Sequence, residues 1–100
     1  MGGFNTNSFI TGQQNVTTSG TPVQLSDLVI PAGILILIKA KNGNTGTITI
    51  GNSSANALNT GSSFFALASG QSVLLQLQNL NRIWIDSTVS GNGIEYLFEQ

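Results

Sequence analysis

A run of five aliphatic residues at positions 34–38, reading Ile-Leu-Ile-Leu-Ile, limits how this chain can fold more than any other feature. Such a run is typical of a β-strand whose alternate side chains are buried on opposite faces of a sheet. A buried helix fits less well, because the run is short, Pro31 and Gly33 precede it, and Asn42-Gly43 follows it. We therefore expect a central strand over residues 34–40 that is buried on both faces near its start.

Short apolar segments of this kind recur along the chain, with turn residues between them and no helical period. Asn42-Gly43 is typical of a β-hairpin, whose second strand we expect over residues 47–51. A second hairpin is expected at Gly91-Asn92-Gly93, joining residues 82–86 to residues 94–99. Together these segments predict an all-β fold, a single-domain antiparallel β-sandwich or jelly roll of about seven or eight short strands.

The first twelve residues differ from the rest, because glycine and polar residues surround the isolated apolar residues Phe4, Phe9 and Ile10. Such a segment cannot form a core by itself, so we expect an extended N-terminal arm over residues 1–12 and a β-sandwich domain over residues 13–100. The arm is either a frayed terminus or a segment that docks on a neighbouring copy. No basic stretch followed by a hydrophobic one is present, so no signal peptide is predicted.

The chain carries three basic and four acidic side chains, or 7% charged residues, against about 25% in ordinary globular domains. It has no basic patch to bind phosphate, so nucleic-acid binding is not expected. No apolar run reaches the roughly 18 residues of a membrane span, so no membrane partner is expected. With a net charge of −1, copies of the chain repel one another little, which favours protein–protein contact.

The residue types present give little support for catalysis. Cysteine and histidine are both absent, which removes thiolate metal ligands, the usual general base and the Ser–His nucleophile. Asp86 and Glu95 are expected to lie opposite or diagonal to each other across the last hairpin, but solvated surface charges explain them better than an acid pair. We expect no enzyme activity, no catalytic or metal-binding residue and no cofactor.

Trp84 is the strongest candidate for a binding residue, since the expected register places it on the outer face of the last hairpin with Leu97 and near Arg82. It is then a core residue under a covering segment, an interface anchor, or a platform for sugar stacking. The interface candidates are Phe4, Phe9, Ile10, Arg82, Trp84 and Leu97. The alternative glycan-binding residues are Trp84, Asn52, Asn56 and Asn59, with Tyr96 as a further aromatic.

Four motifs occur along the chain in order: LSDLVIPAG at residues 25–33, TITIGNS at 47–53, LASGQS at 67–72 and LNRIWID at 80–86. Over most of residues 23–98 this pattern resembles small all-β virion proteins of tailed bacteriophages, in particular head decoration and head-fibre base proteins. The resemblance implies attachment to a capsid surface, commonly as a trimer. It carries over no catalytic residue, because that group is structural.

We therefore predict a structural virion protein that decorates or cements a phage capsid surface through contacts with a capsid or other virion protein. The alternatives are a tail, neck or fibre component of a virion and, in a different class, a carbohydrate-binding, lectin-like module. A homo-oligomer is expected, with the trimer favoured by the resemblance. The expected location is the virion, after synthesis in the host cytoplasm.

Overall fold

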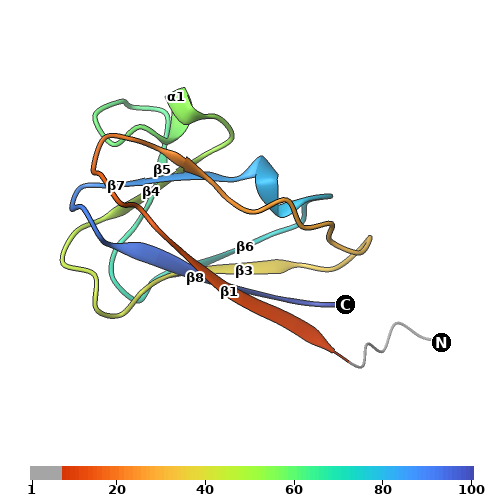
Figure 1. Ribbon diagram of the computed structural model, residues 1–100. Helices are drawn as coiled ribbons and strands as arrows, with labels where there is room; N and C mark the ends of the chain where they lie inside the picture. The colour runs from red at the N-terminus through yellow and green to blue at the C-terminus, as the bar shows by residue number, and fades with distance from the viewer. Residues whose placement is uncertain (1–7) are drawn as a thin grey trace.

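The chain folds into two antiparallel β-sheets of four strands each, stacked as two layers (Figure 1). The structure is a computed structural model that describes residues 8–100. Within this range the strands are β1 (Phe9–Asn15), β2 (Val23–Gln24), β3 (Ile36–Ala40), β4 (Ile48–Gly51), β5 (Phe65–Leu67), β6 (Ser72–Leu75), β7 (Trp84–Ser87) and β8 (Gly93–Glu99). One helical turn, α1 (Ser54–Ala57), and one 3₁₀ turn, η1 (Leu80–Arg82), lie in connections. The predicted all-β sandwich is confirmed.

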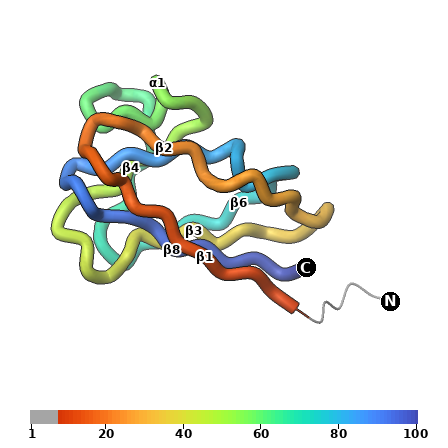
Figure 2. Tube along the Cα trace, viewed as in Figure 1, coloured from red at the N-terminus to blue at the C-terminus, as the bar shows by residue number. Residues whose placement is uncertain are grey.

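The strands pair in a nested order. Sheet A has the order β1-β8-β3-β6, and sheet B has the order β2-β7-β4-β5. Thus β1 pairs with β8, β2 with β7, β3 with β6, and β4 with β5. Of these strands only β4 and β5 are neighbours both in the chain and in a sheet, so every other connection passes from one layer to the other (Figures 1 and 2).

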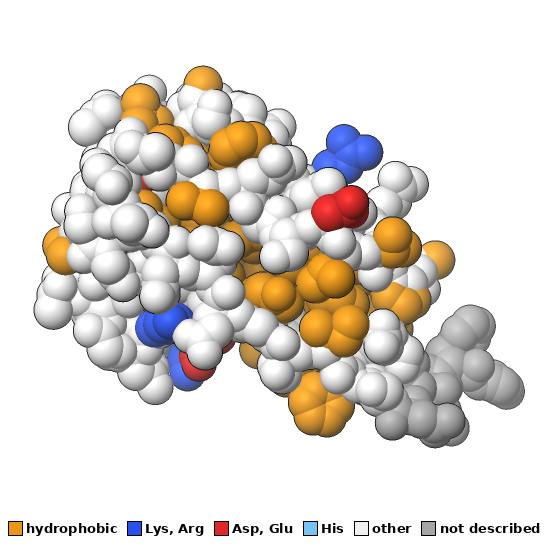
Figure 3. All heavy atoms as spheres, viewed as in Figure 1, with side chains coloured by type: hydrophobic (Ala, Val, Ile, Leu, Met, Phe, Trp, Pro, Cys, Tyr) orange, Lys and Arg blue, Asp and Glu red, His pale blue; other side chains and the backbone are white. Residues whose placement is uncertain are grey.

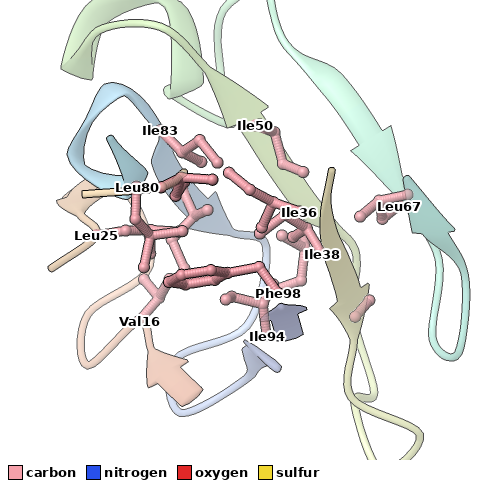
Figure 4. Close-up of a cluster of buried hydrophobic side chains, with 14 residues drawn as sticks. Val16, Leu25, Ile36, Ile38, Ile50, Leu67, Leu80, Ile83, Ile94 and Phe98 are labelled. Carbon is pink, nitrogen blue, oxygen red and sulfur yellow. The ribbon is translucent and has the colours of Figure 1, made fainter. Parts of the chain in front are cut away.

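The core between the sheets is almost wholly aliphatic (Figure 4). Alternation along the strands produces it: Ile36 and Ile38 of β3 point inward from sheet A, while Ile48 and Ile50 of β4 point inward from sheet B. The other buried members of the cluster are Val16, Leu25, Ile30, Ala40, Leu67, Leu80, Ile83, Ile85, Ile94 and Phe98. Burying one such large side chain contributes roughly 1.5–3 kcal/mol, so this layer is the main source of stability.

The strand predicted over residues 34–40 is central but is not buried on both faces. It forms β3, which lies between β8 and β6 in sheet A. Its even-numbered side chains are buried, whereas Leu35, just before the strand, is 49% exposed and Leu37 is half-buried. The expectation of a second buried face was wrong, because neither the other sheet nor a described loop covers the outer side of sheet A.

Both predicted hairpins were also wrong. The connection after Asn42-Gly43 leads from β3 in sheet A to β4 in sheet B, and the connection containing Gly91-Asn92-Gly93 leads from β7 in sheet B to β8 in sheet A. The two connections are joined at one end of the sandwich. The amide of Asn44 donates to Gly93 O (2.9 Å) and accepts from Gly93 N (3.1 Å), while the Asn92 side chain accepts from Gly46 N (2.8 Å). These glycine-containing turns are therefore corners between layers.

The boundary expected between arm and domain falls inside a strand. Residues 9–12 form the first half of β1, which pairs with β8 from Phe9 opposite Glu99 to Asn15 opposite Gly93. Ile10 points inward and packs against the core. Residues 9–12 therefore belong to the sandwich, because main-chain pairing with β8 accommodates Gly12 despite its weak strand preference. Phe4 and the rest of residues 1–7 of the expected arm lie outside the described residues.

Candidate functional site

The outer face of sheet A carries a cluster of exposed apolar side chains. Its members are the exposed Phe9, Leu35, Leu74 and Leu97 and the half-buried Leu37, and we name this cluster the sheet A patch. Leu37 lies directly opposite both Leu97 and Leu74, so these three form a row across β8, β3 and β6. Phe9 is 62% exposed, Leu74 57% and Leu97 38%. Exposed apolar side chains gathered in this way mark surfaces that bind other molecules.

The patch is hollowed and bordered by polar residues. A hollow of about 520 Å³ lies among its side chains, with Glu99 at the rim. In the next row of the same face, Lys39 lies opposite Glu95, with 3.8 Å between Lys39 Nζ and a Glu95 carboxylate oxygen. Most of the surface seen in Figure 3 is uncharged, with few Lys, Arg, Asp or Glu side chains on it. An apolar centre with a polar rim is typical of a protein–protein interface.

The outer face of sheet B is covered at one end. The loop that follows β4 folds back over it through α1, whose start is capped by Ser53 accepting from Asn56 N (3.2 Å). Thr49, on the outer face of β4, is buried and donates its hydroxyl to Ala57 O (2.6 Å). A Cβ on Gly51 would meet the backbone of residues 56 and 57, so the loop packs directly on the sheet. This face is closed to partners at the α1 end.

Asp86 is the centre of this covered face. Its carboxylate is fully buried and accepts hydrogen bonds from three main-chain N–H groups. Oδ1 accepts from Gly20 N (3.0 Å) and Ser87 N (2.7 Å), and Oδ2 accepts from Asn59 N (2.8 Å). The carboxylate thereby holds two loops onto β7, a structural role. The expectation of a solvated Asp86 was wrong because the sequence does not reveal the covering loop.

Asp86 and Glu95 do not form a pair. Asp86 lies opposite Thr49 in sheet B, whereas Glu95 lies opposite Lys39 in sheet A. The predicted proximity depended on a hairpin between β7 and β8, and those strands belong to different sheets. Among residues 8–100, no group of three or more His, Cys, Asp or Glu side chains is placed to hold a metal ion.

Trp84 lies on β7 of sheet B, whereas Leu97 lies on β8 of sheet A, so the predicted joint patch of these two residues does not form. The half-buried indole is opposite Gln24 on one side and Gly51 on the other. Beside it is a hollow of about 600 Å³, whose lining residues are mainly amides: Gln24, Val29, Asn52, Gln78, Asn79, Asn81, Arg82 and Trp84. This arrangement brings an aromatic ring and several hydrogen-bonding groups together at one shallow site.

The predicted glycan-binding asparagines separate in the structure. Asn52 lines the hollow and accepts from the amide of Asn56 (2.6 Å), which places Asn56 behind it. Asn59 is turned inward, where its amide donates to Ser87 O (2.7 Å) and Ser19 Oγ (3.2 Å). Asn59 is therefore a loop clamp and is not available to a ligand.

Tyr96, the further aromatic considered for sugar binding, belongs to sheet A and packs against the core. It lies opposite Gly12, and its ring occupies the space that a side chain on Gly12 would fill. Tyr96 thus fills the gap that glycine leaves in β1 and does not extend the hollow beside Trp84.

Of the interface candidates, the structure brings Phe9 and Leu97 together in the sheet A patch. Leu35, Leu37 and Leu74 belong to the same patch but were missed. Alternation was a usable signal for Leu74, because Val73 and Leu75 beside it point to the core and leave it on the outer face. No comparable signal separates Leu37 from a core residue, since the aliphatic run at 34–38 reads alike on both faces.

Comparison with protein-family models, with curated proteins and with solved structures finds no match for this chain. No helix in residues 8–100 is long and apolar enough to cross a membrane.

Proposed function

We propose that this chain is a structural protein of a virion that attaches to a capsid or other virion protein through the sheet A patch. The observation that carries the proposal is the contrast between sheets: a loop covers the α1 end of the outer face of sheet B, while four exposed apolar side chains and the half-buried Leu37 gather on the outer side of sheet A. Such a surface gains free energy when another protein removes it from water. The proposed role is non-enzymatic.

The proposal extends to the finer class of the fold, which we assign as a jelly roll. The nested pairing of β1 with β8, β2 with β7, β3 with β6 and β4 with β5 supports this assignment. Jelly rolls are frequent among viral capsid proteins and also among lectins, so the fold is compatible with both candidate functions and decides between neither.

The proposed mechanism is cementing. A chain bound across neighbouring capsomers buries apolar surface that is exposed again if the capsomers separate, which raises the free energy of separation. The strength depends on how well the partner fits the patch, because association entropy and desolvation oppose burial. A tail, neck or fibre attachment uses the same surface and differs only in the partner.

The proposal is tested by detecting the chain in virus particles and by adding variants of it back to particles that lack it. The chain is sought by mass spectrometry in virus particles purified from its source, and recombinant variants are then added to particles that lack it. Leu74→Ser combined with Leu97→Ser should leave the sandwich folded but weaken binding at least about tenfold, since central apolar anchors dominate interfaces. Ser72→Ala, on the same exposed face of β6, is the matched control and should bind as the original chain does. Absence from particles, or full binding by the double variant, contradicts the proposal.

A carbohydrate-binding module is the second candidate, and the hollow beside Trp84 favours it. An indole face stacks on the apolar side of a sugar ring, and side-chain amides bond sugar hydroxyls. Trp84, Asn52 and Asn81 supply both kinds of group there. A glycan array tests this function: binding that Trp84→Ala abolishes and the Leu74→Ser/Leu97→Ser variant preserves would establish it in place of the virion role.

A further inference from the structure

The free edge of β1 is the longest exposed sheet edge in the described chain. The four edge strands are β1 with seven residues, β6 with four, β5 with three and β2 with two. Native proteins protect sheet edges by short strands, charged side chains or proline. The sequence of β1, FITGQQN, contains no charge and no proline, so it has none of these protections.

The main-chain groups on this edge can be identified from the register. Gln100 N donates to Ser8 O (3.0 Å), and even-numbered residues of β1 lie opposite even-numbered residues of β8. Hydrogen-bonded and non-bonded residues alternate along an antiparallel strand. The even-numbered residues of β1 therefore bond to β8, and odd-numbered residues such as Thr11 and Gln13 direct their N–H and C=O groups to the free edge. No other strand within residues 8–100 pairs with that edge.

We propose that β1 pairs antiparallel with β1 of a second copy of this chain, joining the two A sheets into one continuous sheet of eight strands. Two-fold symmetry places the same strand on both sides of such an interface, as isologous dimers require. The register that uses the whole strand sets Thr11 opposite Gln13 of the second copy and brings the two Gly12 residues together at the axis.

A second copy fits this edge because the contact is self-complementary in charge. The seven residues of β1 are uncharged, so antiparallel pairing sets no like charges opposite one another. Lys41 approaches one end of the strand, where its Nζ bonds the Asn15 side chain (2.8 Å), and Glu95 and Glu99 lie one strand away on β8. In this pairing both copies present their sheet A patches on the same side of the joined sheet. The inference holds whether the chain binds a virion or a glycan.

The test combines hydrogen exchange with sedimentation on the full chain. Amide exchange at Thr11 and Gln13 should slow by more than about tenfold between dilute and concentrated protein, while exchange at Ile10 and Gly12, already bonded to β8, should change little. In sedimentation the protein should move from monomer to dimer over the same range. A protein that stays monomeric at about 1 mM, a trimer, or odd-numbered amides that are protected where the protein sediments as a monomer would each overturn the proposal.

Substitution at Gln13 tests pairing at the free edge of β1 separately from the pairing of β1 with β8. Gln13→Pro removes an N–H group that points away from β8, so the bonds between β1 and β8 remain while pairing with a second copy is lost. Gln13→Thr keeps that N–H group and is the matched control. The proline variant should be monomeric where the original chain and the threonine variant are dimeric. A proline variant that folds and still dimerises overturns the proposal, and the exchange experiment decides it should the variant not fold.

Discussion

Two cross-strand pairs in this molecule occupy equivalent positions and have opposite surroundings. Each is a directly opposed pair on the outer face of a sheet and contains one carboxylate: Thr49 with Asp86 in sheet B, and Lys39 with Glu95 in sheet A. Asp86 is completely buried, whereas the Glu95 side chain is 53% exposed. The strands alone do not explain this difference. The loop after β4 does, because it covers sheet B around Asp86, and no segment of residues 8–100 covers sheet A in the same way.

The comparison explains how a chain so poor in charge holds its loops in place. Under the covering loop, main-chain N–H groups replace water around Asp86, and each is satisfied by a carboxylate oxygen. Elsewhere asparagine side chains accept hydrogen bonds from main-chain N–H groups in the same way: Asn79 Oδ1 accepts from Leu28 N (3.1 Å) and Asn81 N (2.9 Å). The uncovered sheet A face has no such network, and its leucines remain open to a partner.

The largest expected effect is at Asp86. Replacing Asp86 by Ala leaves three main-chain donors without their acceptor, and we expect a loss of about 3–5 kcal/mol in the free energy of unfolding. Glu95→Ala, the matched change on sheet A, should cost less than about 0.5 kcal/mol because Glu95 is exposed. Urea unfolding of both variants measures the contrast.

Asp86→Asn sharpens this result. Its oxygen can keep the contacts with Gly20 and Ser87, but its amide nitrogen then faces Asn59 N, another donor. The loss should fall between those of the two alanine variants. Equal stability of the Asp86→Ala and Glu95→Ala proteins would show that the loop does not seal the sheet B face.

The second largest effect is expected at Gly51, where the loop touches the sheet. A Cβ there would lie 2.5 Å from the Ala57 main-chain nitrogen, so Gly51→Ala should displace α1 and cost about 1–3 kcal/mol. Gly43 has open space around it, and Gly43→Ala should be neutral or slightly stabilising. Thermal unfolding compares the two, and a Gly51→Ala protein as stable as the Gly43→Ala protein would mean that the loop is not closely packed.

Alternation in the sequence correctly placed Trp84 on the outer face of β7 and Leu97 on the outer face of β8. It could not identify strand partners. The turn residues at Asn42-Gly43 and Gly91-Asn92-Gly93 indicate a change of direction, but a corner between layers and a hairpin need the same backbone freedom. The nested pairing depends on contacts between distant segments, which no local pattern encodes.

Local sequence patterns were also insufficient to predict which candidate surfaces are exposed. Phe9 and Leu97, two of the interface candidates, lie exposed in the sheet A patch. Asp86 was wrongly predicted to be solvated. Its carboxylate is buried because the main-chain N–H groups of Gly20 and Asn59, both remote in sequence, bond to it. Every residue except proline has such a group, so the sequence does not show which ones bind Asp86. Local sequence patterns therefore show which face of a strand a side chain is on. Whether that face of the sheet is exposed to water depends on loops from distant parts of the chain.

A smaller effect is expected from a charge on the uncovered face. Leu37→Asp should leave the chain folded and cost about 1 kcal/mol, because Leu37 is half-buried and its charge stays in contact with water. Burial of this strand on both faces, as expected from the sequence, would instead make the change abolish folding. Ile38→Asp, one residue along and fully buried, is the matched control and should prevent folding. Circular dichroism separates the outcomes, and an unfolded Leu37→Asp protein would mean that sheet A is covered after all.

The smallest effect is expected for the Lys39–Glu95 ion pair. Its charged atoms are 3.8 Å apart, and both side chains are partly exposed, so water screens most of their attraction. A double-mutant cycle with Lys39→Ala and Glu95→Ala should give a coupling of less than about 0.5 kcal/mol at low salt and close to zero at 1 M salt. A salt-resistant coupling well above that value would place the pair in a desolvated setting like that of Thr49 and Asp86. Both pairs would then be shielded from water. The difference between the Thr49–Asp86 and Lys39–Glu95 pairs would have to come from the identity of their side chains.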